Sequence, residues 1–181
     1  MKTESAPAKI KIAFTQLMQQ NTFDKITVAA IVKAAGINRG TFYLHYEDKY
    51  ALVEILAADL LSAIQQIVHD NPGSQSEILT PTGTHSLLTY LYGERQLLRG
   101  LLFSGADLQF QYKLKLILLE NVQVKPHGLP EIYAKEMIVA HFMSVILLWL
   151  QRDCQEPIDQ IATLLQTGTM SDDWHALYHH N

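Results

Sequence analysis

The sequence has a single cysteine, Cys154, which excludes an intrachain disulfide and a cysteine-based metal cage. It also has no glycine-rich phosphate loop, no nucleophile elbow and no spaced His/Glu zinc motif. Enzymatic activity therefore has no directed support in the residues, and we expect a protein that is not an enzyme and needs no cofactor. An enzyme stays open as a competing class, which a gel shift with DNA would separate from a DNA-binding protein.

Long apolar runs are missing as well. No uninterrupted apolar stretch approaches the roughly 20 residues that cross a bilayer, and the first residues lack the order of a signal peptide. We therefore expect a soluble protein without a membrane partner, and the unpaired thiol favours the cytoplasm. Hydrophobic residues make up 48% of the chain, enough for a folded core. They do not alternate strictly with polar residues, which is the pattern of half-buried strands. The expected fold class is all-α.

Basic residues are outnumbered, because 14 Lys and Arg stand against 18 Asp and Glu and give a net charge of -4. This average argues against DNA binding, which depends largely on the neutralisation of phosphates by Lys and Arg. The distribution changes the interpretation: residues 1–50 carry a net charge of +3, and the remainder carries -7. A basic head on an acidic body fits a protein that presents one end to DNA.

Helical periodicity is the main pattern that is present. An apolar stripe that includes Ile10, Phe14 and Met18 predicts a first helix of about four turns. A connector helix is expected over 48–68, followed by a loop over 71–83 that is rich in Ser, Thr, Pro and Gly. The body then shows four further helical patterns, at roughly 84–103, 105–123, 130–153 and 157–167.

Two short helices are predicted between the first helix and the connector. Thr27 has the chemistry of an N-cap for a helix over 27–35, and Gly36 ends that helix. Asn38 caps a second helix over 38–45. Together they form a helix-turn-helix, whose second helix enters the major groove of DNA. The side chains expected to point outward from the second helix are Arg39, Thr41, Tyr43 and His45.

The stretch TVAAIVKAAGINRGTFYLHYEDKYAL resembles the DNA-binding signature of the TetR family of bacterial regulators, and the match spans about 10–56. The resemblance implies an N-terminal three-helix head, residues 1–47, with its helix-turn-helix motif at about 27–46. It further implies a connector helix and a C-terminal helical-bundle domain for effector binding and dimerisation, residues 48–181. The implied function is a sequence-specific transcriptional regulator, usually a repressor that a small-molecule effector releases from its operator.

Carried over by motif position, the resemblance assigns DNA contacts to the head. Thr27 would hold a phosphate, unless it acts as an N-cap alone. Arg39 would bind guanine through two hydrogen bonds, unless it contacts phosphate only. Phe42 and Tyr46 are expected in the core. The residues expected to contact DNA are Thr27, Lys33, Asn38, Arg39, Gly40, Thr41, Tyr43, His45 and Lys49.

A single head contacts too few phosphates for tight binding, so a homodimer on a palindromic operator is expected, with the two heads ~34–36 Å apart. The apolar residues of the last two long helices either form the dimer interface or pack in an ordinary core. The resemblance favours a four-helix interface. The candidate interface residues are Ile138, Phe142, Val145, Trp149, Ile161 and Leu165.

Aromatic residues of the body either line an effector pocket or form plain core. The resemblance favours a pocket that includes Phe103, Phe110, His141 and Met143. The ligand would favour a body conformation whose connector helix holds the two heads at the wrong spacing. The C-terminal histidines, among them His175 and His179, are expected in a solvated tail rather than in a metal site.

Two alternatives to a repressor remain open. One is an activator, or a regulator that depends on a co-activator. The other is a helical protein-interaction adaptor that has kept the fold and binds no DNA.

Overall fold

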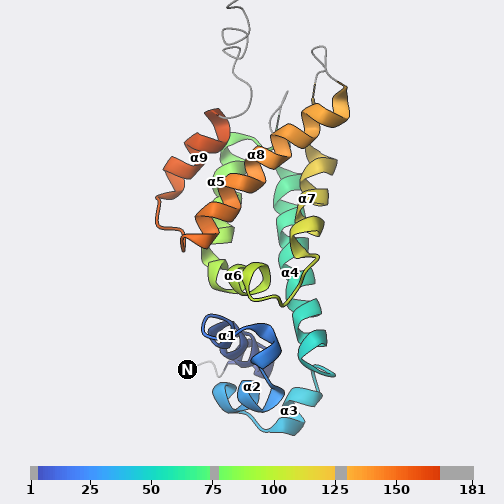
Figure 1. Cartoon of the computed structure of the whole chain (residues 1–181), viewed down its shortest axis with the longest axis vertical. Coiled ribbons are helices and arrows are strands. Elements are labelled where there is room, and N and C mark those ends of the chain that lie inside the picture. The colour runs from blue at the N-terminus through green and yellow to red at the C-terminus, as the bar shows by residue number, and fades with distance from the viewer. Residues whose placement is uncertain (1–3, 74–77, 125–129, 168–181) are drawn as a thin grey trace, which may run out of the picture. The chain divides into compact units, whose positions relative to one another are not determined.

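The computed structural model describes residues 4–73, 78–124 and 130–167. These residues form nine α-helices and one short 3-10 helix. They contain no β-strand, and an isolated bridge joins Pro72 to Leu79. The prediction of an all-α fold is therefore confirmed (Figure 1). The C-terminal histidines lie outside the described residues.

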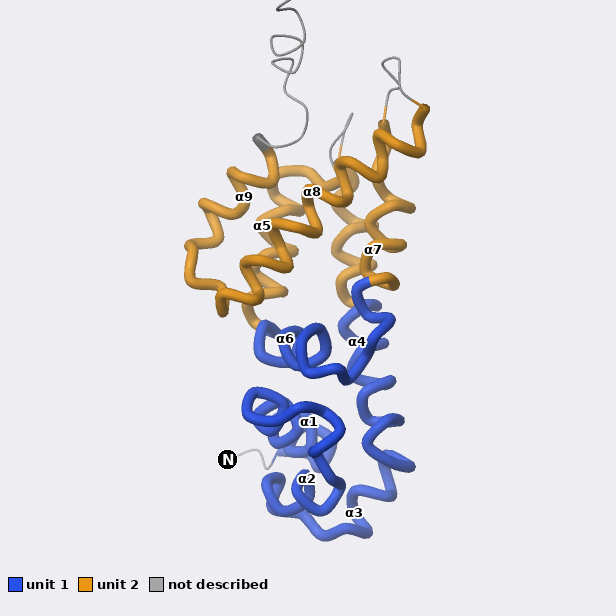
Figure 2. The backbone as a smooth tube through the Cα atoms, viewed as in Figure 1, with its two compact units in different colours: residues 1–62, 94–111 blue, residues 63–93, 112–181 orange. Residues whose placement is uncertain are grey.

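The chain divides into two compact units (Figure 2). Unit 1 comprises residues 1–62 and 94–111, and unit 2 comprises residues 63–93 and 112–181. A segment from the middle of the sequence therefore belongs to the same unit as the N-terminal helices. The predicted boundary near residue 47 is a functional division, and it stays a prediction.

Unit 1 begins with three α-helices and a 3-10 turn, which are α1 (Ala6–Met18), η1 (Phe23–Lys25), α2 (Val28–Ala35) and α3 (Arg39–Tyr43). Their core consists of fully buried apolar side chains, since Ile10, Phe14, Ile31 and Phe42 have no exposed surface. Because α1 packs against α2 and α3, its apolar stripe closes the core over the two shorter helices. The expected three-helix head is therefore present.

The sixth helix, α6 (Arg95–Phe103), packs against α1 within unit 1. At its start, the Lys11 ammonium lies 3.0 and 2.9 Å from the two carboxylate oxygens of Glu94. In its middle, a Cβ atom on Gly100 would lie only 2.6 Å from the terminal carbon of Met18. Just after its end, the Phe23 amide donates to the Ser104 carbonyl oxygen at 3.1 Å. Contacts along its length thus attach α6 to the head.

The long helix α4 (Lys49–Asp70) runs from unit 1 into unit 2. Its start is capped by Asp48, whose Oδ1 accepts hydrogen bonds from the amides of Tyr50 and Ala51, each at 2.8 Å. A carboxylate at this position satisfies free N–H groups and lies at the positive end of the helix dipole. The predicted connector helix is confirmed with slightly later bounds.

Unit 2 contains the end of α4 together with α5 (Pro81–Gly93), most of α7 (Phe110–Asn121), α8 (Glu131–Gln151) and α9 (Ile158–Thr167). Helix α9 packs against α5 and α8. Trp149 of α8 is 1% exposed, stacks on Tyr92 of α5, and donates from its indole nitrogen to the Glu156 carbonyl oxygen at 3.0 Å. The core of this unit is therefore built mainly from helices that are distant in the sequence.

The single helix predicted over 84–103 is wrong, because α5 and α6 are separate helices. Glu94 leaves the helical conformation between them, with φ of -98° and ψ of 10°. The apolar pattern continues through both helices and therefore did not reveal this break. The two helices nevertheless have different partners, because α5 packs in unit 2 and α6 packs in unit 1. The predicted loop also extends too far, because Thr80 accepts the Gly83 amide through Oγ1 and α5 begins at Pro81.

The helix predicted over 105–123 begins later than expected. Gly105 has a φ of +81°, and the Asp107 carboxylate accepts the Gln109 amide at 2.9 Å, so a turn precedes Phe110. This turn belongs to unit 1, as do the first two residues of α7.

Two of the described helices, α4 and α8, are long and apolar enough to cross a membrane by length and composition alone. The core helices of soluble proteins pass the same test. Here α4 contributes Leu52, Leu60 and Ile64 to the core, and α8 contributes Phe142 and Trp149. Two such helices are therefore weak evidence for a membrane span.

Candidate nucleic-acid interface

The first helix of the predicted helix-turn-helix is α2, and its two ends are fixed by local chemistry. The Thr27 hydroxyl oxygen accepts the Ala30 amide at 3.2 Å, which makes Thr27 the N-cap. Because the hydroxyl accepts in this bond, its own proton stays available for a phosphate oxygen. At the other end Gly36 takes a left-handed conformation, with φ of +63°, and ends the helix.

The second helix, α3, is fixed by Asn38. The Asn38 Oδ1 atom accepts both the amide of Thr41, at 2.7 Å, and its hydroxyl, at 2.9 Å. This cap uses the side-chain oxygen and leaves the amide nitrogen of Asn38 for other partners. Gly40 follows within the first turn, where a Cβ atom would lie 3.4 Å from Asn38 Oδ1, an ordinary contact. The fold of α3 therefore does not itself require glycine at residue 40.

Arg39 and Tyr43 form a pair on the exposed face of α3. The Arg39 Nε and Nη2 atoms lie 3.3 and 3.0 Å from the Tyr43 hydroxyl, and the guanidinium carbon lies 5.5 Å from the centre of the tyrosine ring. Tyr43 is 46% exposed. Tyr43 thus holds the planar Arg39 guanidinium, which has five donors, on the outer surface. The hydroxyl proton of Tyr43 is still able to donate to a phosphate.

The aromatic residues around this pair divide as expected between core and surface. Phe42 is fully buried, and Tyr46 is 7% exposed. Burial raises the pKa of the Tyr46 hydroxyl, and the carboxylate of Asp59 raises it further. Tyr46 therefore stays neutral and structural, whereas Tyr43 faces solvent.

Lys33 and His45 are also exposed. Lys33 lies in the last turn of α2, where a cation stabilises the negative end of the helix dipole as well as being accessible to a phosphate. His45 follows α3, with its ring centre 6.2 Å from that of Tyr46. Both residues are therefore accessible at the surface of the head.

Lys49 has a different environment from the phosphate contact that the motif implies. Its ammonium donates to the carbonyl oxygens of Phe23, Asp24 and Ile26, at 2.9, 3.1 and 2.8 Å. A lysine has three donors, and all three are used here within the protein. The expectation that Lys49 binds phosphate is thus not supported by its contacts, and sequence position alone could not reveal this.

Helices α2 and α3, each capped at its start, form a helix-turn-helix with an exposed outer face and a buried core. Residues 13–56, which contain it, match the family described as bacterial regulatory proteins, tetR family. The DNA-binding head of this chain is therefore similar to that of the TetR family. The matched segment includes every residue predicted to contact DNA.

Relatives and solved structures are similar to the chain beyond this head as well. An uncharacterised HTH-type transcriptional regulator, YxbF of Bacillus subtilis (strain 168), is 23% identical over 158 residues, which is 83% of this chain and 41% of that protein. The chain thus spans less than half the length of this relative. The crystal structure of a TetR transcriptional regulator from Streptococcus agalactiae 2603V has a TM-score of 0.65 and 23% identity, and covers 91% of this chain and 94% of its own.

A second solved structure is FadR from Bacillus subtilis in complex with stearoyl-CoA. It has a TM-score of 0.62 and 17% identity, and covers 90% of this chain and 97% of its own. At these identities the structures show that the TetR fold extends over both units, and they show nothing of this chain's ligand.

The predicted dimer-interface residues lie mostly in the core of unit 2. Five of the six are buried, with exposed fractions of 1–5%, and these five are Ile138, Phe142, Trp149, Ile161 and Leu165. Val145 is half-buried. Side chains covered by their own chain offer little surface to a second copy, so the plain-core alternative describes these five in the structure.

The four predicted effector-pocket residues do not come together in one unit. Phe103 and Phe110 belong to unit 1, and His141 and Met143 belong to unit 2. Phe110 is fully buried, whereas Phe103 is 45% exposed. The His141 Nε2 atom lies 3.3 Å from the Leu164 carbonyl oxygen, which ties α8 to α9.

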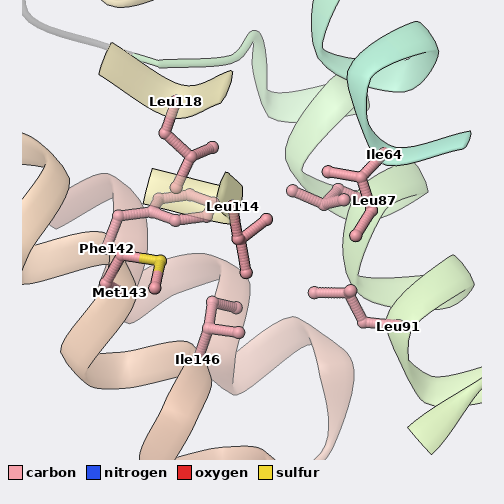
Figure 3. Close-up of a pocket in the computed structure, with 8 residues that line it drawn as sticks. All are labelled: Ile64, Leu87, Leu91, Leu114, Leu118, Phe142, Met143 and Ile146. Carbon is pink, nitrogen blue, oxygen red and sulfur yellow. The ribbon is translucent and has the colours of Figure 1, made fainter. Parts of the chain in front are cut away.

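Met143 does line a small cavity in unit 2 (Figure 3). The volume of this cavity is about 10 Å³, enough for one water molecule. Figure 3 shows that the side chains around it are all apolar: Ile64, Leu87, Leu91, Leu114, Leu118, Phe142, Met143 and Ile146. The other three predicted pocket residues do not line it.

Sequence reasoning missed the part that α6 plays in the head. The contacts of Glu94 and Gly100 with α1 involve residues more than 80 positions apart in the sequence. Glu94 after Gly93, inside an apolar helical pattern, was a usable sign of a break. Nothing local indicated which helix Glu94 would meet.

Proposed function

We propose that this chain is a repressor that binds a palindromic DNA operator as a homodimer and leaves it when an apolar effector occupies unit 2. The observation that supports DNA reading most directly is the Arg39–Tyr43 pair on the exposed face of α3. A guanidinium held at the surface of a groove-reading helix is suited to guanine, whose O6 and N7 atoms accept two hydrogen bonds.

Phosphate contacts would position this reading helix. The Thr27 hydroxyl, the Asn38 amide nitrogen and the Tyr43 hydroxyl each keep donor capacity after their internal bonds are made. Lys33 and His45 add exposed donors on the same head. Contacts of this kind fix register and orientation, while Arg39 supplies sequence preference.

The dimer interface is proposed to be the exposed face of α8. This face is a stripe of apolar and small residues at helical spacing, and its members are Tyr133, Met137, Ala140, Ser144 and Leu148. Tyr133, Met137 and Leu148 are 64%, 49% and 57% exposed. Large side chains flanking two small ones allow two copies of the helix to approach closely about a two-fold axis. Leu164 of α9, which is 52% exposed, is a candidate to extend the surface.

The effector is proposed to enter the apolar cavity beside Met143. Ligand sites usually have volumes of roughly 300–1,000 Å³, so this cavity would have to open. The side chains around it are apolar, which favours a ligand that is itself largely apolar. The FadR structure contains an acyl-CoA, and its fold resemblance makes acyl compounds a reasonable first class to test.

Ligand binding in unit 2 would reach the head through the chain itself. The sequence passes between the units within α4, between Gly93 and Glu94, and at the start of α7. Two of these passages bracket α6, which is attached to α1 through Glu94 and Gly100. A ligand that favours one arrangement of these segments would shift the population of DNA-competent heads by its differential affinity.

The DNA-reading proposal is tested by selecting bound fragments from a genomic or random duplex library. We expect palindromes with half-sites about one helical turn apart. Arg39→Ala should weaken binding by about 1–3 kcal/mol for each contacted base pair and relax the preference at one position in each half-site. Placing the selected site between a promoter and a reporter gene should lower expression.

Arg152→Ala is a matched control, since it removes an arginine that pairs with Glu156 at the end of α8. It should leave the selected sequence unchanged. Failure of the wild-type protein to enrich any sequence would reject the proposal, and raised reporter expression would replace the repressor with the activator alternative.

A further inference from the structure

The Lys49 ammonium joins the first turn of α4 to the segment between α1 and α2. Its three acceptors, the carbonyl oxygens of Phe23, Asp24 and Ile26, all belong to this segment, which contains the 3-10 turn η1. Lys49 is thus more than 20 residues from its partners in sequence. We call this set of three hydrogen bonds the Lys49 clamp.

A lysine at the start of α4 is placed against the helix dipole, whose positive end lies there. Asp48, the preceding residue, accepts the amides of Tyr50 and Ala51 and so offsets part of this cost. Three carbonyl oxygens also stabilise the ammonium, because each brings a partial negative charge within 3.1 Å of it. The fold itself therefore takes the place of water around this cation.

Two aromatic rings surround the Lys49 clamp. The ammonium lies 4.5 Å from the ring centre of Phe23 and 5.5 Å from that of Tyr50. The same rings meet edge to face at 5.3 Å, and Phe23 contacts Phe14 of α1 in the same manner at 6.3 Å. A cation on aromatic faces adds attraction to the hydrogen bonds. These contacts thus join the start of α4 to η1 and α1.

We propose that Lys49 is a positioning residue, which contacts no DNA and transmits the direction of α4 to the reading helices through the Lys49 clamp. The residue after its last acceptor is Thr27, the cap of α2. Any rotation of the start of α4 therefore moves the beginning of the helix-turn-helix. In the dimer this coupling sets the distance between the two reading helices. The inference rests on the proposed function for its DNA-dependent consequences.

Two substitutions separate positioning from phosphate binding. Lys49→Met removes the charge and the donors but keeps the length of the side chain. Lys49→Arg keeps the charge, but the donors of a planar guanidinium fork cannot converge on three oxygens gathered around one nitrogen. Lys25→Met is the matched control, since it removes the same charge from the exposed surface of η1.

Three measurements on the full chain apply to each variant. The first is the dependence of operator affinity on salt, which reports the number of neutralised phosphates. The second is the ratio of affinities for the selected operator and for one with a base pair added between its half-sites. The third is the hydrogen exchange of the Lys25 and Ile26 amides, which donate to the Thr22 and Phe23 carbonyl oxygens.

We expect Lys49→Met and Lys49→Arg to behave alike. Both should weaken operator binding about tenfold, because fewer heads hold the competent arrangement. Both should keep the wild-type salt dependence, discriminate less between the two spacings, and exchange the Lys25 and Ile26 amides faster. Lys25→Met should keep the wild-type discrimination between spacings.

A salt slope that falls by about 0.9 in Lys49→Met, with Lys49→Arg like wild type, would show a phosphate contact and overturn the inference. Weaker binding with an unchanged ratio of affinities for the two operators would show that Lys49 only stabilises the fold. This result would also overturn the inference. If the wild-type protein binds no DNA, the proposed function fails instead. The Lys49 clamp is then judged by amide exchange, and unchanged exchange in both variants would reject it.

Discussion

Neighbouring residues of α3 have separate tasks in folding and in recognition. The side-chain oxygen of Asn38 is committed to the fold, because it accepts the amide and the hydroxyl of Thr41. Gly40 is not, since a Cβ atom there would make only an ordinary contact. A glycine that the fold does not require lowers helix stability, so a reason for it is expected outside the chain. Close approach of the DNA backbone is such a reason.

Gly40→Ala should therefore separate stability from binding. Replacement of a helical glycine by alanine should raise the free energy of unfolding by about 0.5–1 kcal/mol. Operator affinity should fall, because the added methyl group would meet the DNA. Thermal unfolding and fluorescence anisotropy with labelled operator measure the two quantities.

Gly36→Ala is the comparison for this experiment. Gly36 has a φ of +63°, so alanine there should destabilise the head rather than stabilise it. If Gly40→Ala binds the operator as tightly as wild type, the DNA contact assigned to Gly40 is wrong.

At the scale of elements, α8 has one apolar face that is buried and another that is exposed. Its buried face carries Ile138, Phe142 and Trp149 into the core of unit 2. Its exposed face carries Met137 and Leu148. The sequence pattern identified the apolar face of α8 but could not tell which apolar side chains the same chain would cover.

Leu148→Glu should convert the dimer to monomers. Two-fold symmetry places two added carboxylates in each interface, and like charges brought together cost several kcal/mol. We expect the dimer dissociation constant to rise by about 100-fold or more, with unit 2 still folded because Leu148 is 57% exposed. Light scattering after size-exclusion chromatography measures the mass, and circular dichroism checks the fold.

Ile55→Glu tests whether any new charge on an exposed apolar residue has the same effect, since Ile55 of α4 is 43% exposed. It should remain dimeric. A Leu148→Glu protein of unchanged mass would move the interface away from this face of α8.

At the scale of the whole molecule, the proposed regulation requires that a ligand in unit 2 change the behaviour of unit 1. The cavity beside Met143 has a volume of only about 10 Å³, so the core around it is nearly fully packed. Opening this core costs free energy that an effector must recover by binding. The effector then acts as a switch only if the opened state also holds the heads poorly for DNA.

Leu118→Ala tests this mechanism by opening the cavity in advance. Leu118 is 1% exposed and lines the cavity, so its truncation should lower the free energy of unfolding by about 2–5 kcal/mol. A small apolar probe such as benzene should then raise the melting temperature more in the variant than in wild type. The same probe should weaken operator binding by the variant.

Leu101→Ala is the control, because Leu101 is fully buried in unit 1 and its truncation leaves the cavity unchanged. Equal stabilisation of both variants by benzene would indicate non-specific binding and would count against the cavity as the effector site.

Local chemistry in the sequence was sufficient to predict the two short helices of the head. Thr27, Gly36 and Asn38 fix the ends of two short helices through interactions within a few residues, and Phe42 is apolar on the inward side of the second. Such interactions depend on neighbours along the chain, so the printed order of residues determines them. The all-α fold and the connector helix followed from periodicity for the same reason.

Tertiary structure alone decided which distant segments would meet. The apolar pattern over 84–103 could not show that its second half would join the head, because the partner of Glu94 is Lys11. Likewise, the motif placed Lys49 beside DNA, whereas the folded chain surrounds its ammonium with three carbonyl oxygens. Burial and long-range hydrogen bonding depend on the packing of whole helices, and a single sequence read along its length does not contain that packing explicitly.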